Sequence, residues 1–506
     1  MNMLHLTKLG FKNPDDFTRL RDVFEKAGYT DKGVLNVIGV KDFPSMKGTD
    51  VPLLLRRTKD NTPLNTLIRL FLIEVPCDME SVKLAVQPMK LESLAEAGIV
   101  QIDGVSVTAA VKLMPYKNFY IAFDLPCMLQ SGSKKNYVMG IGSSTLTLAN
   151  LTVRKQSRLT LDLGTGCGIH AFLAAEHSDR VIAADLNPRA VRFAEFNARL
   201  NNLSHVRCLE GDLFGPVKGK KFDLVVSNPP FVISPETQYI YRDGGMEGDR
   251  ITRKIVSQVP QFLNEGGYCQ ILCNWAELRG QDWNDRLHKW FDGTGCDAWV
   301  MRSESLDAET YALTWIRHTE KSETGQFPQR FEKWMAYYEA QGISSMGAGL
   351  ITMRRSCGRS NWFRADDAPE KMQGPCGDDI ARGFEMSDFL ETITDDSMLL
   401  DLQFHISPEV RLERQSKPSP EGWLDESVRL RLAKGLSYSG NIDYYVANML
   451  IKCDGSRRLG DLLNEMAHAL QTDPEKIKSS FCSIVRHLVE RGFLLPPVPS
   501  PLGGED

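Results

Sequence analysis

Two consecutive prolines directly follow an apolar run, and they limit the folds open to this chain more than any other feature. Within Lys221–Pro235 (KFDLVVSNPPFVISP), the run FDLVV predicts a buried parallel strand. The sequence Asn228-Pro229-Pro230-Phe231 ends this strand. Because prolines have a fixed φ angle and no N–H donor, the backbone is rigid here and cannot continue a β-ladder. The Asn228 side chain and the Pro229 carbonyl are therefore expected at the carboxyl end of a strand, where open α/β sheets bind ligands.

Two oxygen acceptors beside a flat aromatic ring suit a planar N–H2 group. The carboxamide of Asn228 and the carbonyl of Pro229 would each accept one hydrogen, beside the ring of Phe231. An amide and the exocyclic amine of a base both carry such a group, so the pattern indicates methyl transfer onto nitrogen. The alternative is a plain strand-ending turn, because Asn-Pro dipeptides often form turns.

A glycine-rich turn lies upstream of this strand. Leu159–Leu163 predicts a strand, Gly164–Gly168 (GTGCG) a tight turn and Ile169–Glu176 a helix. Glycines at alternate positions let a ligand approach the backbone closely. The spacing GxGxG differs from the GxGxxG of dinucleotide sites, although an NAD site or a simple strand-to-helix connection is the alternative interpretation.

Acidic residues end the next two predicted strands. Arg180–Ala184 runs into Asp185, whose carboxylate would accept hydrogen bonds from both hydroxyls of a ribose. Val206–Leu209 is followed by Glu210-Gly211-Asp212-Leu213, where an acid would meet an adenine amine. Asp185 and Asp212 would otherwise serve as helix N-caps. Glycine turn, ribose acid, adenine acid and acceptor pair follow one another in this order, which favours a single cofactor-binding sheet.

The motifs DLGTGCG, AADLNP, EGDLF and NPPFVISP resemble those of class I S-adenosylmethionine-dependent methyltransferases of the NPP[FY] type. Within this methyltransferase small-domain family, the sequence is most similar to the release-factor glutamine N5-methyltransferases, and relatives methylate adenine N6 or guanine N2. The resemblance covers about Tyr120–Arg355. Phe231 stands where the glutamine enzymes usually carry tyrosine and is more typical of the ribosomal RNA guanine enzymes, whereas the following VISP favours the glutamine type.

The resemblance implies S-adenosyl-L-methionine as cofactor and assigns roles to the motif residues. The glycines would lie beside the methionine moiety with Asp162 accepting from its ammonium, Asp185 would hold the ribose, and Asp212 with Leu213 the adenine. The implied cofactor-binding residues are Asp162, Gly164, Thr165, Gly166, Cys167, Gly168, Asp185, Leu186, Asn187, Asp212, Leu213 and Asn228. The implied catalytic residues are Asn228, Pro229, Pro230 and Phe231.

The implied reaction needs no strongly perturbed general base. Acceptors outside the plane of an amide or aryl amine would favour pyramidal nitrogen and direct its lone pair at the methyl group, in an in-line displacement aided by positioning and electrostatics. His170, early in a predicted helix, is interpreted as structural. Eleven cysteines without paired spacing predict neither a structural metal nor disulfides, and Cys269 and Cys273 are expected to be buried thiols.

Composition fits an intracellular, cytoplasmic enzyme with more than one domain. The chain has 506 residues, of which 42% are hydrophobic and 25% charged. We expect no membrane span, since the most apolar stretch, Leu67–Val75, contains Arg69 and Glu74. The N-terminus lacks the hydrophobic region of a signal peptide. A net charge of −5 gives no global nucleic-acid footprint.

The chain is predicted to be an α/β protein with a seven-stranded, mostly parallel, Rossmann-like methyltransferase sheet. Helical, winged-helix-like domains are expected on either side of it, which divides the chain into residues 1–115, 116–365 and 366–506. Helices are expected over Phe17–Ala27, Thr62–Glu74 and Met79–Ala97, followed by a hairpin within Ile99–Leu113. After a loose stretch, Ser356–Asp396, three helices are expected over Ile442–Lys452, Leu459–Leu470 and Pro474–Glu490.

Two functions remain open at this point, and both need a macromolecular partner. The first is methylation of a protein glutamine or similar amide, most simply in a translation factor; the acidic balance and VISP favour it. The second is methylation of an exocyclic amine in RNA or DNA, favoured by Phe231 and the winged flanks. A cofactor-binding protein without catalysis and a small-molecule acceptor are further alternatives. Two glycine-containing segments, Tyr137–Asn150 and Tyr239–Asp249, are candidate lids over the site, and Ser143 and Ser144 are expected to line the cofactor pocket. The sequence leaves the oligomeric state unknown.

Overall fold

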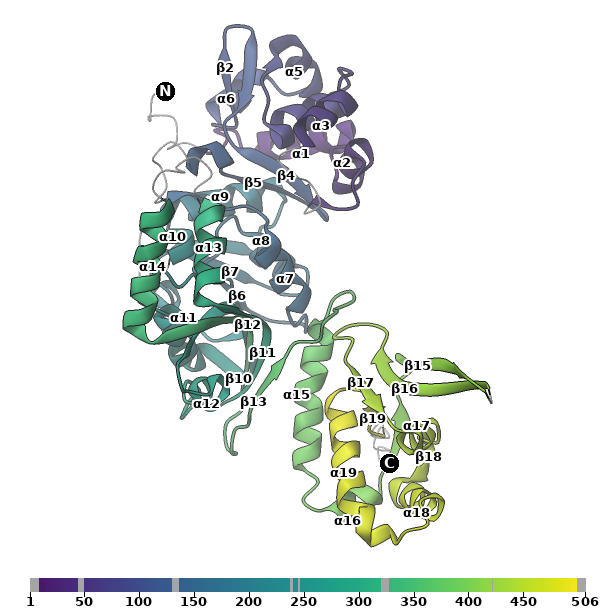
Figure 1. Cartoon of the computed structure of the whole chain (residues 1–506). Coiled ribbons are helices and arrows are strands. Elements are labelled where there is room, and N and C mark those ends of the chain that lie inside the picture. The colour runs from purple at the N-terminus through teal and green to yellow at the C-terminus, as the bar shows by residue number, and fades with distance from the viewer. Residues whose placement is uncertain are drawn as a thin grey trace, which may run out of the picture. The chain divides into compact units, whose positions relative to one another are not determined.

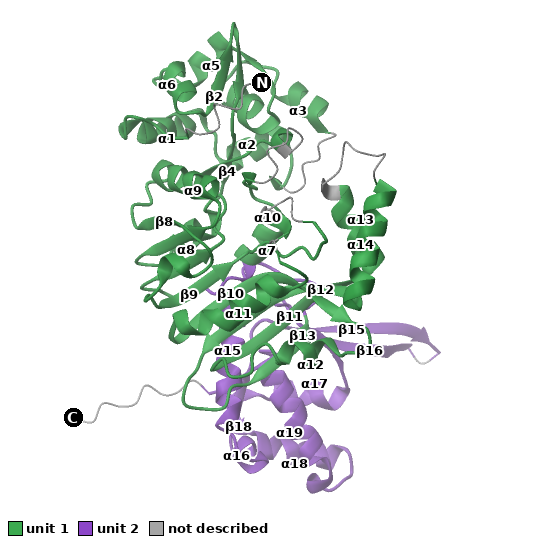
Figure 2. Ribbon diagram, turned by 90° about the vertical axis from the view of Figure 1, so that its left-hand side faces the viewer, with its two compact units in different colours: residues 1–149, 156–367 green, residues 150–155, 368–506 purple. Residues whose placement is uncertain are grey.

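The computed structural model describes residues 9–43, 50–129, 136–236, 240–243, 246–319, 327–420 and 422–497. The chain forms two compact units (Figure 2). The first comprises Met1–Ala149 and Gln156–Asp367, and the second comprises Asn150–Lys155 and Ala368–Asp506. The chain therefore joins the second unit twice, first for a short segment and then for its C-terminal part. The predicted domains 1–115, 116–365 and 366–506 stay a prediction.

An eight-stranded sheet lies within the first unit (Figure 1). Its strand order is β13-β11-β12-β10-β9-β6-β7-β8. The neighbouring strands β8, β7, β6, β9 and β10 are parallel to one another. β12 is antiparallel to both of its neighbours, and β13 is parallel to β11. The bounds are β6 (Thr160–Leu163), β7 (Val181–Asp185), β8 (Val206–Glu210), β9 (Phe222–Ser227), β10 (Leu263–Leu278), β11 (Cys296–Asp307), β12 (Ile343–Arg355) and β13 (Phe363–Asp367). The Rossmann-like sheet is confirmed, and it has one strand, β13, more than the seven expected.

Helices cover both faces of this sheet. In β7, Val181 and Ala183 belong to one buried cluster, whereas Ile182 and Ala184 belong to another. The first cluster includes residues of α8 and α9, and the second includes residues of α11 and α12. Since successive side chains of a strand point to opposite faces, the sheet is buried on both. The helices of this region are α7 (Ser143–Leu151), α8 (Ile169–Ala175), α9 (Pro188–Leu200), α10 (Ile240–Asp243), α11 (Arg250–Gln258), α12 (Trp283–His288), α13 (Ala308–Thr319) and α14 (Phe327–Gln341), with short 3-10 helices at Pro126–Leu129, Gly215–Val217 and Val259–Phe262.

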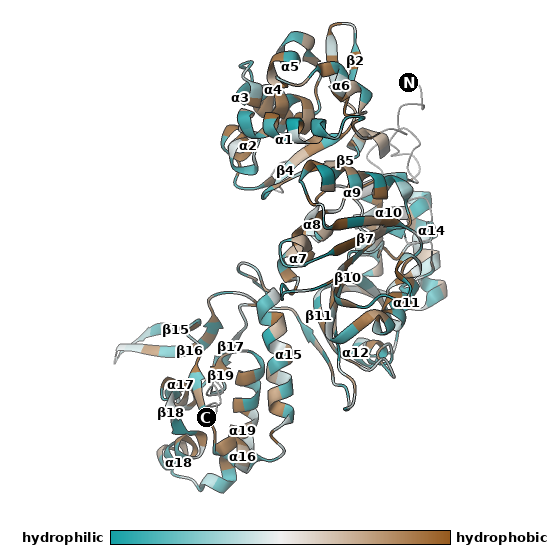
Figure 3. Ribbon diagram, turned by 180° about the vertical axis from the view of Figure 1, so that it is seen from behind, coloured by the Kyte–Doolittle hydropathy of each residue, from teal (hydrophilic) through white to brown (hydrophobic). Residues whose placement is uncertain are grey.

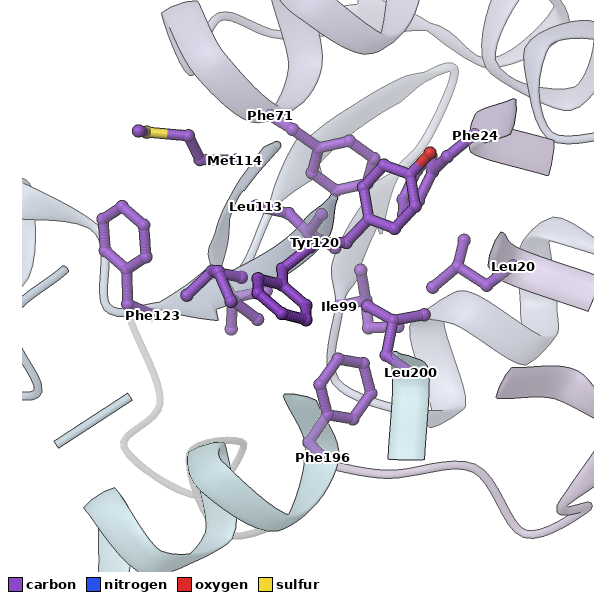
Figure 4. Packing of buried hydrophobic residues seen from close by; sticks show 14 of the residues in the cluster. Leu20, Phe24, Phe71, Ile99, Leu113, Met114, Tyr120, Phe123, Phe196 and Leu200 are labelled. Carbon is purple, nitrogen blue, oxygen red and sulfur yellow. The ribbon is translucent and has the colours of Figure 1, made fainter. Parts of the chain in front are cut away.

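The N-terminal helices pack against α9 through one apolar cluster. Figure 4 shows Phe24, Phe71 and Tyr120 close together, with Phe196 and Leu200 of α9 extending to the same cluster. The N-terminal elements are α1 (Asp15–Ala27), α2 (Asp31–Ile38), α3 (Val51–Arg57), α4 (Pro63–Leu67), a π-helix (Ile68–Ile73), α5 (Met79–Ala85), α6 (Leu91–Glu96), and the strands β1 (Cys77–Asp78), β2 (Val100–Asp103), β3 (Ser106–Ala109), β4 (Lys112–Tyr116) and β5 (Phe119–Phe123).

One N-terminal helix differs from the prediction. Met79–Ala97 forms two helices, α5 and α6, instead of one. Pro88 lies between them, and its missing N–H and its ring interrupt the helical hydrogen bonds that apolar spacing alone would predict. The hairpin around Asp103-Gly104 is confirmed as β2–β3, which pairs with β1 in a three-stranded sheet.

Asn197 of α9 and Asn201, the C-cap of this helix, bind β5 as an adjacent strand would. Asn197 accepts from the Ala122 amide at 2.8 Å and donates to the Ala122 carbonyl at 2.9 Å. Asn201 accepts from the amide of Tyr120 and donates to its carbonyl, each at 2.8 Å. Asn197 also donates to the Cys167 carbonyl at 2.9 Å, so it ties β5 to the glycine-rich turn.

The second unit contains the three predicted C-terminal helices, α17 (Tyr444–Ile451), α18 (Leu459–Ala469) and α19 (Pro474–Glu490). They accompany a three-stranded sheet, β18-β14-β19, and a second one, β15-β16-β17, that was not predicted. Figure 3 shows why: β15 and β16 are largely hydrophilic, in contrast to the central strands β7 and β10. The remaining bounds are α15 (Gly377–Glu391), α16 (Asp396–Leu400), β14 (Gln403–Ile406), β15 (Val410–Ser419), β16 (Gly422–Leu432), β17 (Ser439–Ile442), β18 (Asp454–Arg458) and β19 (Leu494–Leu495). The stretch Ser356–Asp396, expected to be loose, contains β13 and α15.

The short segment Asn150–Lys155 packs within the second unit. The carbonyl of Asn150 accepts from the amide of Cys376 at 2.8 Å, and Lys155 pairs with Glu385 at 2.6 Å. A Cβ on Gly377 would lie 1.9 Å from the Thr152 carbonyl oxygen, so only glycine permits this approach. Along the chain, this segment connects α7 to β6. None of the helices in the described ranges is both long and apolar enough to cross a membrane.

Candidate active site

Three predicted features of the site lie at the carboxyl ends of three adjacent parallel strands, β6, β7 and β9. Leu163, the last residue of β6, lies opposite Ala184 of β7 and Ser227 of β9. The glycine-rich turn, Asp185 and Asn228 therefore share one edge of the sheet. From β6 the chain continues through β7 and β8 in one direction, whereas β9 and β10 extend in the other. This reversal of strand order is the usual position of a ligand site in an open α/β sheet.

The glycines of the turn have different surroundings. Gly164, Gly166 and Gly168 have φ angles of 77°, 56° and 93°, in the region that side chains disfavour. A Cβ on Gly164 or Gly166 would meet nothing within 4 Å, whereas one on Gly168 would lie 2.4 Å from the ring of Phe172. The first two glycines therefore leave space beside the backbone, and the third allows the turn to pack on α8.

Asp162, in β6, is buried beneath the turn. Its Oδ2 accepts from the Thr165 hydroxyl at 2.6 Å and from the Ala171 amide at 2.9 Å. Its Oδ1 is buried and has no hydrogen-bond partner within the described part of the chain. Burial raises the pKa of Asp162 to about 7, and the neighbouring Asp185 adds to the rise. An unpaired carboxylate oxygen at this depth is suited to a cationic or hydrogen-donating ligand.

Asp185 joins the glycine-rich turn to the beginning of α9. One carboxylate oxygen accepts from the Gly166 amide at 2.9 Å and the other from the Asn187 amide at 2.8 Å. Burial raises the pKa of Asp185 above its ordinary value. Asn187, not Asp185, caps α9, by accepting from the Arg189 amide at 3.0 Å, so the N-cap interpretation of Asp185 is wrong. Leu186 is 54% exposed, which leaves an apolar side chain beside the carboxylate.

Asp212 and Leu213 lie beyond β8. Asp212 is exposed and faces Lys254 at 3.5 Å. Leu213 is half-buried and has a φ angle of 44°, a backbone conformation that residues other than glycine rarely adopt. Such local strain is commonly found where a binding loop has a fixed shape. Phe214 precedes the short helix Gly215–Val217 as its N-cap, so Asp212 is not a helix cap either.

Asn228 has one occupied and one unoccupied hydrogen-bonding group. Its Nδ2 donates to the Ser144 hydroxyl at 3.3 Å, while its Oδ1 is buried without a partner among the residues described. Ser227, just before it, donates to the Leu163 carbonyl at 2.8 Å and fixes the end of β9 on β6. Because Nδ2 is engaged, Oδ1 is available to accept from a donor outside the chain.

The remaining acceptor-side residues continue from Asn228. Pro229 is buried, and Pro230 and Phe231 are half-buried. The ring of Phe231 meets Trp315 of α13 edge-on, with centroids 6.3 Å apart and an angle of 72°. Ser144 and Trp315 come from distant parts of the sequence, and no motif pointed to Trp315. Ser144 was expected near the cofactor pocket, and that role stays a prediction.

Other predicted features have different outcomes. His170 is buried, and burial lowers its pKa to about 4, as suits a structural residue. In the candidate lid Tyr239–Asp249, residues 239, 244 and 245 lie outside the described residues. Arg242 and Asp243 form a buried ion pair at 2.5 Å, so their charged groups face each other and not the solvent. In the ranges that the structure describes, no group of three or more His, Cys, Asp or Glu side chains is arranged to hold a metal ion.

Comparison with known families identifies the part of the chain that contains this end of the sheet. The model of the methyltransferase small domain matches residues 139–293, which contain every predicted site residue. Two further models, each described as a domain of unknown function, match residues 26–110 and 381–496.

Three curated relatives illustrate the range of similar proteins. A putative protein N5-glutamine methyltransferase of Methanocaldococcus jannaschii is 35% identical over 26% of this chain and 68% of its own length. A release factor glutamine methyltransferase of Geobacter sulfurreducens is 35% identical over 22% of this chain and 43% of its own length. Ribosomal RNA small subunit methyltransferase C of Alcanivorax borkumensis is 31% identical over 25% of this chain and 34% of its own length. The chain thus spans about two thirds of the first relative and less than half of the other two.

Among solved structures, the YcgJ protein of Bacillus subtilis is 14% identical, with coverage of 43% of this chain and 99% of that one and a TM-score of 0.30. A tRNA m1G37 methyltransferase of M. jannaschii is also 14% identical, with coverage of 50% and 61% and a TM-score of 0.29. At these scores the likeness carries no argument about chemistry.

Proposed function

The chain belongs to the S-adenosylmethionine-dependent methyltransferases of the methyltransferase small domain family, and we propose that it methylates a planar nitrogen, namely the side-chain amide of a protein glutamine. The observation that carries this proposal is the buried Oδ1 of Asn228 at the carboxyl end of β9, which has no hydrogen-bond partner among the described residues. Asn228 directly follows β9, which pairs with β6, the strand that leads into the glycine-rich turn. An acceptor with no internal partner is costly unless a ligand satisfies it, and an amide N–H2 would do so.

The residues of the adjoining edge fit S-adenosyl-L-methionine. Gly164 and Gly166 leave space for the methionine moiety. In the part of the chain that the structure describes, Oδ1 of Asp162 has no hydrogen-bond partner, and the ligand's ammonium would supply one. Asp185 would accept from the ribose hydroxyls, and the exposed Leu186 would pack on the adenine. Thr165, Cys167, Gly168 and Asn187 would shape this pocket, with Asp212 and Leu213 at its adenine end. When bound, the cofactor supplies an electrophilic methyl group.

The protein's contribution to the transfer is positioning. Oδ1 of Asn228 and the carbonyl of Pro229 would accept the two hydrogens of the target nitrogen, and Phe231 would stack on its plane. Acceptors outside that plane stabilise a pyramidal nitrogen, whose lone pair is then available, and they favour the positive charge that develops on it. His170 takes no part, because it is buried with a pKa of about 4.

A glutamine is favoured over a nucleic-acid base by the relatives' names. The relatives named a putative protein N5-glutamine methyltransferase and a release factor glutamine methyltransferase are each 35% identical, and a ribosomal protein uL3 glutamine methyltransferase of Bradyrhizobium diazoefficiens is 34% identical. Phe231 and the ribosomal RNA relative support the second candidate, an exocyclic base amine in RNA or DNA. For the first candidate we propose a translation factor as partner and the cytoplasm as location.

The acceptor class can be tested by label transfer. Purified protein is incubated with methyl-labelled cofactor and cell extract, and the products are treated with protease or nuclease. The proposal expects the label to be released by protease and to resist nuclease, with methylglutamine in the hydrolysate. Nuclease-sensitive label would refute the glutamine proposal in favour of the base amine.

Asn228→Ala tests the acceptor pair itself. We expect loss of transfer by about a hundredfold or more, since it removes a hydrogen bond made to the reacting group. Asn264→Ala is the matched control, because Asn264 lies at the amino end of β10, opposite the site, and its side-chain amide donates to Asp223 at 2.6 Å. Transfer that survives Asn228→Ala at the control's rate would contradict the assignment.

A further inference from the structure

The segment that follows Pro230 is buried but is not part of the sheet. Val232 and Ile233 are 4% and 0% exposed, and neither lies in a strand. The two prolines end the ladder of β9, so the peptide groups beyond them need other partners. Buried backbone groups are almost always paired, because leaving one unpaired is costly.

Two tyrosines provide the partners for Ile233. The Ile233 amide donates to the Tyr311 hydroxyl at 3.1 Å, and the Tyr338 hydroxyl donates to the Ile233 carbonyl at 2.8 Å. Tyr311 lies on α13 and Tyr338 on α14, the two helices inserted between β11 and β12. Asn274 of β10 also donates to the Tyr311 hydroxyl at 2.8 Å, which fixes that hydroxyl to the sheet. Burial raises the pKa of Tyr311 to about 12, so it stays protonated under assay conditions.

The same helix places a second ring beside Phe231. Trp315 is four residues after Tyr311 and therefore on the same face of α13. It meets Tyr311 with centroids 6.1 Å apart and Phe231 with centroids 6.3 Å apart. Val232, Ile233, Tyr311 and Tyr338 all belong to one buried cluster, against which Phe231 and Trp315 pack.

We propose that Tyr311 is a positioning residue of the acceptor site, and that Trp315 forms a second aromatic wall beside Phe231. This proposal rests on the proposed methyl transfer. The stretch from Asn228 to Ile233 is stiffened by its two prolines and is held at both ends. Ser227 and Ser144 hold its beginning, and the hydroxyls of Tyr311 and Tyr338 hold its end. Fixing both ends determines the direction of the Asn228 amide and of the Phe231 ring.

Tyr311→Phe removes one hydroxyl and leaves the ring. We expect the initial rate of total label transfer at saturating cofactor to fall about tenfold, because a small displacement of positioning groups has effects of this order. The affinity for S-adenosyl-L-homocysteine, measured by calorimetry, should remain within about twofold, because the Tyr311 hydroxyl accepts from Ile233 and Asn274, neither of which is a predicted cofactor residue. Tyr337→Phe is the matched control: its hydroxyl accepts from the Gly248 amide at 2.8 Å, whereas the Ile233 amide binds Tyr311.

A second measurement is independent of activity. Hydrogen–deuterium exchange of a peptide covering Asn228–Glu236 should be faster in Tyr311→Phe than in wild type and unchanged in Tyr337→Phe. If Tyr311→Phe does not fold, Trp315→Leu takes its place, because it keeps both hydrogen bonds of Ile233. We expect this variant to transfer the methyl group more slowly and to bind S-adenosyl-L-homocysteine with unchanged affinity.

The outcomes separate the two proposals. If Tyr311→Phe lowers the transfer rate, the affinity for S-adenosyl-L-homocysteine and the thermal stability together, Tyr311 is merely structural and the inference is refuted. Unchanged transfer or unchanged exchange also overturns it. The chemical nature of the labelled acceptor decides between a protein and a nucleic-acid substrate. It does not affect the ratio of the transfer rates of Tyr311→Phe and wild type. If no acceptor is labelled at all, the proposed function fails, and the exchange experiment still decides whether Tyr311 fixes the segment.

Discussion

Asp162 should make cofactor binding dependent on pH. Its folded-state pKa of about 7 means that it is largely protonated in mildly acidic solution. If the ligand's ammonium binds the ionised form, affinity follows the ionised fraction, which is about 1% at pH 5 and about 50% at pH 7 for this pKa. We therefore expect affinity for S-adenosyl-L-homocysteine to rise about fiftyfold over this interval, approaching tenfold per pH unit at its acidic end.

The sign of the accompanying stability change follows from linkage. Burial raises the folded-state pKa of Asp162 above its unfolded value, so its contribution to stability is fully present below about pH 4 and is lost as pH rises toward about 7. The shift corresponds to a loss on the order of 4 kcal/mol for the ligand-free protein. Asp162→Asn removes this titration, and the variant should keep more of its stability at neutral pH than wild type does.

Calorimetric titrations with S-adenosyl-L-homocysteine between pH 5 and pH 7 measure the effect, with Asp162→Asn and Asp223→Asn alongside. Asp223 serves as control because its carboxylate accepts from the Arg158 amide at the other edge of the sheet, at 2.8 Å. Asp185→Asn reports any contribution of the second carboxylate, whose pKa burial also raises. A wild-type affinity that changes by less than about threefold, or an Asp162→Asn variant with the wild-type slope, would refute the reasoning.

Two further predictions concern the frame of the site. Gly168→Ala should destabilise the fold by about 1–3 kcal/mol in urea unfolding, since its φ is 93° and the new methyl would lie 2.4 Å from the Phe172 ring. Gly166→Ala shares the cost of a positive φ, 56°, but has space for the methyl, so it should destabilise the fold less and mainly weaken binding of S-adenosyl-L-homocysteine. The reverse order of destabilisation would contradict the geometry. Asn197→Leu should cost about 2–4 kcal/mol, because it leaves the buried Ala122 amide and carbonyl unpaired; a midpoint within about 0.5 kcal/mol of wild type would be contrary evidence.

The sequence was sufficient to predict local elements of the site and their order. Short apolar runs, each followed by a glycine, acid or proline motif, correspond to β6, β7, β8 and β9, because strand and turn signals are local. Their association at one edge follows from parallel pairing, which a Rossmann-like sheet imposes. The proposed roles of individual site residues stay predictions.

Contacts that depend on distant segments were beyond the sequence. Ser144 approaches Asn228 from 84 residues away, and Tyr311 approaches Ile233 from 78 residues away. No local pattern encodes such pairs. Strands β15 and β16 were missed although Val428–Leu432, at the end of β16, alternates apolar and charged residues as a half-buried strand does. Most of the remaining residues of the two strands are exposed, which weakens the signal over the rest of the hairpin. β10 and β12 extend well beyond their apolar centres because pairing with each other continues into polar residues.

The placement of Asn150–Lys155 in the second unit makes the two units inseparable by any single cut. A fragment ending at Asp367 would keep this segment but lose Cys376, whose amide binds Asn150, and Gly377, which fits against Thr152. The helix bearing Ser144 runs directly into that segment. Truncation or exchange of the second unit would therefore have to include both pieces of the chain at once.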